Sequence, residues 1–190
     1  MRLFAALLIL AGCSNEQSRI MVEARSFPDG QALLIGDSIA AAHSGATLCG
    51  LRLFNGAIGG TGAEEWTGIA PDLVAELSPS LLVVSLGIVD ARRNADPEAW
   101  ERHYRRIAGL AQNVVLVSIA PVDRARISER PVSERLIAEF NRRLGDIAAE
   151  RGAPVVPPLS RAMTTDGIHL SPEGQAEWGR NLDSSCPAPN

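Results

Sequence analysis

Lysine is absent from this chain of 190 residues, so every basic side chain is an arginine. The glycine-rich run over 56–62 is therefore not a nucleotide-binding P-loop, which needs a lysine followed by serine or threonine. The formal net charge is −4. An acidic chain lacks the positive surface that attracts phosphate backbones, so we expect no nucleic-acid partner.

Histidine and cysteine are scarce, with three of each in the whole sequence. Their spacing matches no common metal-binding pattern, so we expect no metal site. The scarcity of histidine also leaves few candidates for a general base. His103 lies among charged residues, and we interpret it as solvent-facing, while His43 is interpreted as part of a local helix or loop.

The apolar stretch over 3–10 is too short to span a bilayer, and it follows the positively charged pair Met1-Arg2. Small residues come next, which is the layout of a secretory signal peptide. The stretch Leu10-Ala11-Gly12-Cys13 resembles the lipobox of bacterial lipoproteins. The resemblance implies a lipoprotein signal peptide over 1–12 and lipid attached to the sulfur of Cys13.

Residues 13–30 are mostly polar and end in a turn signal, so we predict a lipidated, flexible tether there. Ser14 resembles the residue found in lipoproteins that are sent to the outer membrane. We therefore expect an exported, lipid-anchored protein of the bacterial cell envelope that faces the periplasm. The alternative is an ordinary signal peptide that happens to precede a cysteine.

Cys49 and Cys186 remain once Cys13 is assigned to lipid. An even pair of cysteines in an oxidising compartment indicates a possible disulfide. Two free, partly buried thiols are the alternative, because a sequence does not give the distance between them.

Short apolar runs alternate with helical patterns over 31–190, a length that suits one domain. The predicted strands are 31–35, 51–55, 81–86, 114–119 and 154–156, and the predicted helices are 96–112, 132–151 and 171–182. Continuous apolar strands that alternate with helices are typical of a parallel sheet covered on both faces. The sequence therefore predicts an α/β fold with three layers, α/β/α, around a flavodoxin-like, parallel, five-stranded sheet.

Ser38 follows the first predicted strand, in Gly36-Asp37-Ser38-Ile39, where a helix should begin. Ligands of parallel sheets bind beyond the carboxyl ends of the strands. Asp166 and His169 lie three residues apart in a predicted loop far downstream. Because a hydroxyl nucleophile needs a base and the base needs an orienting group, we predict that Ser38, His169 and Asp166 form a catalytic triad. Taken singly, Ser38 could be a helix cap and His169 could cap a turn.

The order and spacing of these blocks resemble those of the SGNH hydrolases, the GDSL-type serine esterases and lipases. Asn55–Thr61 resembles their second block, and Asp166–His169 resembles their last. The resemblance implies the SGNH fold over 31–190 and cleavage of carboxylic esters through an acyl-enzyme at Ser38. It also implies an oxyanion hole made by the backbone N–H groups of Ser38 and Gly60, and no cofactor.

Val89 departs from the family pattern, since Gly87-Ile88-Val89-Asp90 stands where the family has an asparagine at the third position. That asparagine supplies a third oxyanion donor, and valine has none to offer. Losing one such donor typically costs about 10²–10³ in turnover, so we expect weaker activity. Asn94 is a candidate replacement donor, and a capping role in the loop is its alternative.

The expected substrates are acyl or acetyl esters of lipids, glycans or small molecules, acted on by a monomer at the membrane. The loop 120–131 carries Arg124, Arg126 and Arg130, which could contact an anionic substrate or simply be solvated. A non-catalytic acyl- or glycan-binding envelope lipoprotein on the same fold is the main alternative. A receiver-like signalling domain is a second one, which the signal peptide opposes.

Overall fold

The structure, a computed structural model, describes residues 15–128 and 131–187. The predicted signal peptide over 1–12, the lipidation site Cys13 and the loop residue Arg130 lie outside the described residues, so these assignments stay predictions. In the described ranges, no helix has the length and apolar character that crossing a membrane requires.

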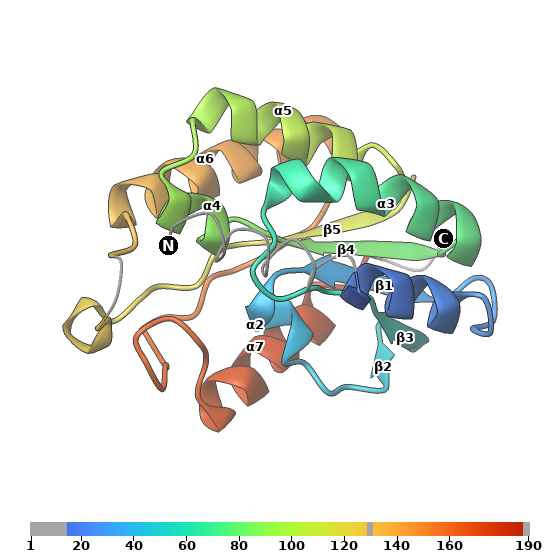
Figure 1. The fold of residues 1–190 in the computed structure, drawn as a ribbon, viewed down its shortest axis with the longest axis horizontal. Coiled ribbons are helices and arrows are strands. Elements are labelled where there is room, and N and C mark those ends of the chain that lie inside the picture. Colours follow the sequence, from blue (N-terminus) through green and yellow to red (C-terminus); the bar gives the residue numbers. More distant parts are fainter. Residues whose placement is uncertain (1–14, 129–130, 188–190) are drawn as a thin grey trace.

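A six-stranded sheet occupies the centre of the molecule, with its strands in the order β2-β3-β1-β4-β5-β6 (Figure 1). The parallel strands are β1 (Ala32–Gly36), β3 (Leu51–Asn55), β4 (Leu81–Ser85), β5 (Val114–Val117) and β6 (Val155–Val156). They confirm the predicted parallel sheet. The predicted count of five strands is wrong, because the strand β2 (Thr47–Leu48) pairs antiparallel with β3 at the sheet edge. A strand of two residues is too short to leave a periodic pattern.

Helices cover both faces of the sheet, which confirms the three-layer arrangement (Figure 1). One face carries α3 (Ala63–Leu77), α5 (Pro97–Ala108) and α6 (Glu134–Arg151), and the other carries α7 (Pro172–Ser184). Two short helices, α2 (Ser38–Ala41) and α4 (Ile88–Arg93), follow β1 and β4. The predicted helices correspond to α5, α6 and α7.

These three helices begin at side chains that cap the free backbone N–H groups of the first turn. Asp96, Ser133 and Ser171 each accept a hydrogen bond from a backbone N–H three residues ahead. Pro97 and Pro172 occupy the first helical positions of α5 and α7, where the missing N–H of proline costs nothing.

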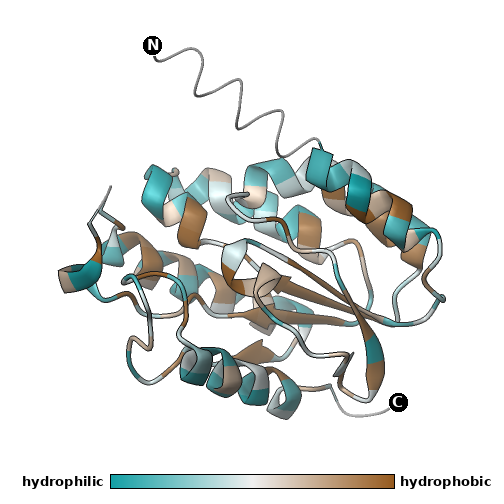
Figure 2. Cartoon of the chain, turned by 60° about the horizontal axis from the view of Figure 1, so that its bottom comes forward, coloured by the Kyte–Doolittle hydropathy of each residue, from teal (hydrophilic) through white to brown (hydrophobic). Residues whose placement is uncertain are grey.

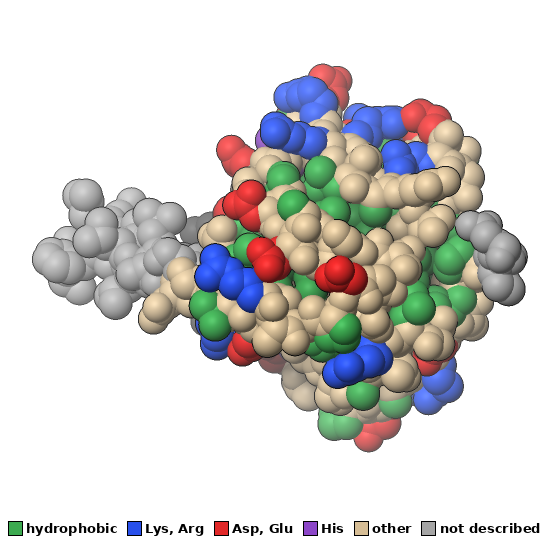
Figure 3. All heavy atoms as spheres, turned by 90° about the vertical axis from the view of Figure 1, so that its right-hand side faces the viewer, with side chains coloured by type: hydrophobic (Ala, Val, Ile, Leu, Met, Phe, Trp, Pro, Cys, Tyr) green, Lys and Arg blue, Asp and Glu red, His purple; other side chains and the backbone are tan. Residues whose placement is uncertain are grey.

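The core lies between the sheet and the helices, and every residue of β1, β4 and β5 is buried. Figure 2 shows the strands as hydrophobic and the outer faces of the helices as hydrophilic. Acidic and basic side chains are interspersed on the face shown in Figure 3, and hydrophobic side chains form small patches between them.

A buried aromatic cluster joins α5 to α6. The ring of Trp100 stacks on Phe140 with centroids 4.4 Å apart and lies 4.8 Å from Tyr104. The Tyr104 hydroxyl donates a hydrogen bond to the carbonyl oxygen of Val84, at 2.8 Å, which ties the cluster to the sheet.

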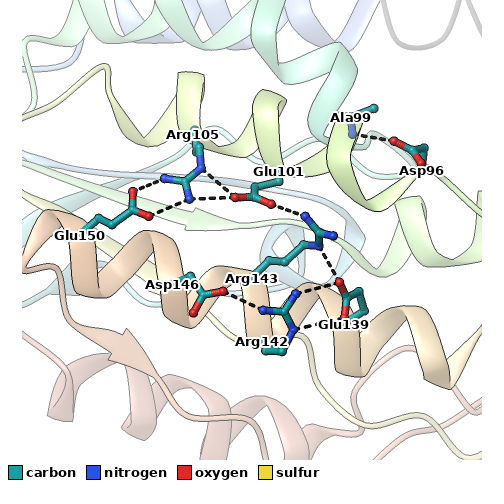
Figure 4. A network of polar contacts seen from close by, with 9 residues as sticks. All are labelled: Asp96, Ala99, Glu101, Arg105, Glu139, Arg142, Arg143, Asp146 and Glu150. Carbon is teal, nitrogen blue, oxygen red and sulfur yellow. Dashed lines mark hydrogen bonds and ion pairs between the residues drawn. The ribbon is translucent and has the colours of Figure 1, made fainter.

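A charged network crosses the outer side of the same two helices (Figure 4). Arg105 of α5 pairs with Glu101 at 2.8 Å and also with Glu150 of α6. Arg143 of α6 pairs with Glu139 at 2.7 Å and also with Glu101. The Arg143 and Glu101 side chains are only 18% and 21% exposed, so this partly buried network joins α5 to α6 together with the aromatic cluster beneath it.

Residues 15–24 are helical, and the side chains of Ile20 and Ala24 are buried. This differs from the flexible tether predicted over 13–30, because an apolar face of the segment packs onto the domain. Phe27 extends the contact, with its ring edge-on to that of Phe54 at 5.1 Å. The folded domain therefore begins before residue 31.

Candidate active site

Ser38 lies at the carboxyl end of β1, where the chain turns sharply into α2. Only glycine fits at position 36, since an added Cβ there would lie 2.5 Å from the carbonyl oxygen of Ser85 on β4 and 2.6 Å from the Cβ of Ala40 on α2. Asp37 caps α2 by accepting a hydrogen bond of 3.0 Å from the backbone N–H of Ile39. Ser38 is thereby held, half-buried, at the first position of the helix.

The structure brings Ser38, His169 and Asp166 together in a chain of hydrogen bonds. The Ser38 Oγ lies 3.0 Å from His169 Nε2, and His169 Nδ1 lies 2.6 Å from Asp166 Oδ2. With the proton on Nδ1, the imidazole donates to Asp166 and Nε2 accepts from the Ser38 hydroxyl. This tautomer is the one that a general base acting on serine requires.

The Asp166 carboxylate is held by the loop that carries it. Its Oδ1 accepts hydrogen bonds from the backbone N–H groups of Ile168, at 3.0 Å, and His169, at 2.8 Å. Partial desolvation raises the pKa of Asp166, but the hydrogen bonds from the His169 ring and from these amides outweigh it. The net effect holds the pKa of Asp166 well below its usual range. Asp166 is therefore ionised and oriented at neutral pH.

Gly167 allows this loop to pack against the segment after β5. Its φ is +94°, and an added Cβ would lie 2.5 Å from the carbonyl oxygen of Asp123. The backbone N–H of Asp123 donates to the carbonyl oxygen of Gly167 at 2.9 Å. The position of Asp166 and His169 thus depends on a close backbone contact that a larger residue would prevent.

A pocket of about 250 Å³ opens beside the Ser38 hydroxyl. It is lined by Ser38, Gly59, Gly60, Ile88, Val89, Arg92, Ile168 and His169. An added Cβ on Gly59 would lie 3.8 Å from the Ser38 Cβ, so the glycine backbone passes close to the serine. Val89 is half-buried in the wall, so an apolar side chain stands where the resemblance to the SGNH hydrolases implies a donor.

Two other sequence candidates have structural roles. Asn94 is exposed and ends α4 in the left-handed conformation, with φ of 55°. This agrees with the alternative interpretation of Asn94 as a capping residue. His43 is half-buried and packs edge-on to Trp178, with ring centroids 5.4 Å apart. Burial lowers the pKa of His43, which suits a packed, neutral imidazole.

The arginines of the loop 120–131 interact with neighbouring groups. Arg124 lies 3.6 Å from Glu134, and Arg126 lies 3.3 Å from Asp123. Arg126 also donates to the carbonyl oxygen of Thr164 at 3.2 Å, in the segment that leads to Asp166. Arg126 thereby links this loop to the segment before Asp166, whereas both side chains of the Arg124 pair are largely exposed.

Two carboxyl groups that the sequence analysis did not single out are buried behind the pocket. Desolvation raises the pKa of Asp37 to about 7, although the Ile39 amide opposes the shift. Desolvation also raises the pKa of Asp90, which accepts a hydrogen bond of 3.1 Å from the backbone N–H of Ala63 at the start of α3. Both acids support the backbone around the pocket.

The arrangement combines a hydroxyl, an imidazole and a carboxylate at the edge of a partly apolar pocket. Such a set can move a proton from serine to histidine while the carboxylate stabilises the imidazolium. Within 15–128 and 131–187, no group of three or more histidine, cysteine or acidic side chains could hold a metal ion.

Comparison with known proteins places the chain among hydrolases. Residues 34–177 match the model of the GDSL-like lipase/acylhydrolase family, whereas no curated protein sequence matches the chain. A solved structure from Streptococcus pneumonia, described by reference to platelet activating factor, is 22% identical with a TM-score of 0.75 and covers 95% of this chain and 97% of its own.

Two further solved structures are similar. TesA is 26% identical with a TM-score of 0.66, and the match covers 81% of this chain and 96% of TesA. The lipase/acylhydrolase from Enterococcus faecalis is 20% identical with a TM-score of 0.69, over 81% of this chain and 94% of that protein. These matches support the same α/β/α fold across nearly the whole length of each relative.

Proposed function

Because the chain belongs to the GDSL-like lipase/acylhydrolase family, we propose that it is a serine esterase that forms an acyl-enzyme at Ser38. The observation that carries the proposal is the pair of contacts at His169, 3.0 Å to the Ser38 hydroxyl and 2.6 Å to Asp166. Family membership supports ester hydrolysis as the type of reaction. The nucleophile and its partners are the finer part of the proposal.

In the acylation step, the Ser38 oxygen attacks the ester carbonyl while His169 Nε2 takes the hydroxyl proton. The tetrahedral intermediate then collapses, the bond to the alcohol oxygen breaks, and His169 returns its proton to the leaving alcohol. Deacylation repeats the sequence with water, which His169 deprotonates, and the acid product leaves with Ser38 restored. Asp166 stabilises the imidazolium in both steps.

Two backbone donors, the N–H groups of Ser38 and Gly60, would stabilise the oxyanion in this scheme. Ser38 starts a helix, where N–H groups are free of helical partners. Gly60 lines the same pocket with a φ of +77°, a conformation that glycine adopts without strain. Val89 adds no third donor, so we expect a slower esterase than one with three.

The proposed substrates are acyl or acetyl esters of lipids, glycans or small molecules. The apolar side chains of Ile88, Val89 and Ile168 in the wall suit a hydrocarbon acyl group. The pocket volume of about 250 Å³ lies just below the usual range for small-molecule sites, roughly 300–1,000 Å³. We therefore expect short acyl chains to be cleaved faster than long ones.

The test is hydrolysis of p-nitrophenyl acetate, butyrate and octanoate by the wild-type protein and by Ser38→Ala. We expect Ser38→Ala to reduce turnover by roughly 10³ or more, because the nucleophile is removed. Ser184→Ala is the matched control, since Ser184 is exposed at the end of α7, and it should retain wild-type turnover. Equal rates for wild type and Ser38→Ala would contradict the proposal.

The apolar Val89 wall favours a second candidate, a non-catalytic acyl- or glycan-binding protein of the cell envelope. Covalent labelling with a fluorophosphonate separates the two functions, because it requires an activated serine but no correct substrate. Labelling that Ser38→Ala abolishes supports the esterase. Folded wild-type protein that neither labels nor hydrolyses any of the esters supports the binding protein.

A further inference from the structure

The oxyanion loop, defined here as residues 58–62, is held in place by α4, the short helix that also carries Val89. We propose that Arg93, the last residue of α4, is a positioning residue that fixes the Gly60 backbone for oxyanion binding. This inference rests on the proposed esterase function, and it assigns to α4 a role that does not need a side-chain donor at position 89.

Arg93 connects three groups of the oxyanion loop and of α3. Its Nη2 donates to the carbonyl oxygen of Gly60 at 2.8 Å, and its Nη1 contacts Glu65 Oε1 at 2.5 Å. The second oxygen of Glu65 accepts from the backbone N–H of Gly62 at 3.0 Å. The planar guanidinium fork can serve two acceptors at fixed angles, which a single ammonium group cannot do.

The remainder of the loop is fixed by buried contacts near its ends. The Thr61 hydroxyl donates to the carbonyl oxygen of Ile58 at 2.7 Å and accepts from Trp66 Nε1 at 2.9 Å. Ile58, Thr61 and Trp66 are all buried. Gly59 and Gly60, by contrast, are exposed, so the part of the loop that faces the substrate is also the part that packing restrains least.

Gly60 therefore depends on polar contacts for its orientation. It has a φ of +77°, and an added Cβ would meet no atom within 4 Å. Glycine has the greatest backbone freedom of any residue. The carbonyl of Gly60 belongs to the peptide group that follows this residue, and its N–H belongs to the one before. Because Arg93 holds the carbonyl, it limits rotation about the Gly60 backbone bonds and with it the direction of the N–H.

A second contact from α4 secures the end of the same loop. Both carboxyl oxygens of Asp90 lie within hydrogen-bonding distance of the backbone N–H of Ala63, at 3.1 and 3.3 Å. Asp90 thus holds the start of α3 while Arg93 holds Gly60. With valine at position 89, the oxyanion relies on fewer donors, so their exact direction matters more, since preorganised donors are what stabilises the developing charge.

The Glu65 partner keeps the Arg93 side chain in position across the neutral pH range. Burial raises the pKa of Glu65, but its hydrogen bonds from Arg93 and from backbone amides outweigh this and lower it. The side chains of Arg93 and Glu65 are 46% and 40% exposed. An ion pair this exposed contributes little to global stability, so an Arg93 variant should remain folded while its loop loosens.

The test compares Arg93→Met with Arg142→Met, a matched replacement of an exposed arginine that pairs with Glu139 and Asp146 on α6. We expect Arg93→Met to lower kcat by roughly 10- to 100-fold, because a small misplacement of a catalytic group has effects of this size. KM should change little, and the unfolding temperature should match that of Arg142→Met. Millimolar guanidinium should restore part of the lost kcat to Arg93→Met and none to Arg142→Met.

Arg93→Lys provides the second variant, and it should fall between wild type and Arg93→Met. An equal kcat for Arg93→Met and Arg142→Met would overturn the inference. So would a loss of kcat that follows a loss of folded protein and does not respond to guanidinium. If Ser38→Ala keeps the turnover of the wild type, the proposed function itself is wrong. If Ser38→Ala loses turnover but Arg93→Met keeps the wild-type kcat, only the positioning role of Arg93 is wrong.

Discussion

At the scale of single residues, the proposed function makes Val89 the side chain that decides how many groups could stabilise the oxyanion. Its side chain lines the pocket beside Ser38 and Gly60 but has no N–H or O–H to donate. An asparagine at this position would supply a side-chain N–H donor, as the resemblance to the SGNH hydrolases implies. A replacement of Val89 changes one wall of the pocket and leaves the other lining residues in place, so its effect on turnover can be measured.

Val89→Asn should raise the kcat for p-nitrophenyl acetate by roughly 10-fold or more, since a single oxyanion donor is worth about 10²–10³ in turnover. The gain should disappear in the double variant that also carries Ser38→Ala. Val89→Ala is the control, because it changes the volume of the pocket without adding a donor, and it should not reproduce the gain. Unchanged or lower turnover in a well-folded Val89→Asn protein would place position 89 outside the oxyanion hole.

Asp37 gives the protein a predictable dependence of stability on pH. Burial raises its pKa from 3.8 to about 7. A carboxyl whose pKa is higher in the folded state stabilises the fold fully below its unfolded pKa, and this contribution is lost as the pH rises through the folded pKa. Asp37 therefore favours the folded state near pH 4 and loses that contribution between about pH 4 and pH 7.

Asp37→Asn should remove this dependence, because an amide oxygen can still accept from the Ile39 N–H and carries no charge to desolvate. We expect the free energy of unfolding of the variant, relative to wild type, to rise by roughly 2–3 kcal/mol from pH 5 to pH 8, since only the part of the shift above pH 5 falls in this window. Urea unfolding at the two pH values measures it. Asp72→Asn, at an exposed position on α3, is the control. Parallel pH profiles for wild type and Asp37→Asn would show that Asp37 ionises normally.

At the scale of helices and strands, the sequence predicted those elements whose pattern is long or continuous. The strands β1, β4 and β5 are runs of buried apolar residues, and α5, α6 and α7 each start at a recognisable cap. The helix α3 was not predicted, because Gly68 and Pro71 interrupt its pattern. Tertiary packing overrides this weak local preference: Trp66, Ala70 and Leu73 are fully buried against the core.

In the candidate site, too, residues in a local motif were predicted and contacts between distant segments were not. Ser38, Asp166 and His169 were predicted from their motifs, and the structure brings them within hydrogen-bonding distance. The contact of Arg93 with Gly60 was not predicted. It joins residues 33 positions apart, and it depends on how α4 lies against a glycine loop. No local pattern in the sequence encodes that arrangement.

At the scale of the whole molecule, the last segment of the chain spans the sheet from one edge to the other. It leaves β6 at one edge, crosses the carboxyl ends of the strands with Asp166 and His169, and continues through α7. On the way, Gln175 donates to the carbonyl oxygen of Ile39 at 3.1 Å. The segment ends at the disulfide between Cys186 and Cys49, whose Cα atoms are 5.4 Å apart. The turn that carries Cys49 lies between β2 and β3, at the opposite edge.

This disulfide closes a loop with a sequence separation of 137 residues, so removing it should release a large amount of chain entropy in the unfolded state. We expect the double variant Cys49→Ala/Cys186→Ala to lose roughly 2–5 kcal/mol of stability, measured by urea unfolding. Wild type unfolded in the presence of a reductant is the control and should match the variant. Because Gln175 and the packing of α7 still hold the His169 loop, kcat at 25 °C should remain near the wild-type value. Two titratable thiols in the folded, untreated protein, with no stability difference from the variant, would show that the two cysteines are not bonded.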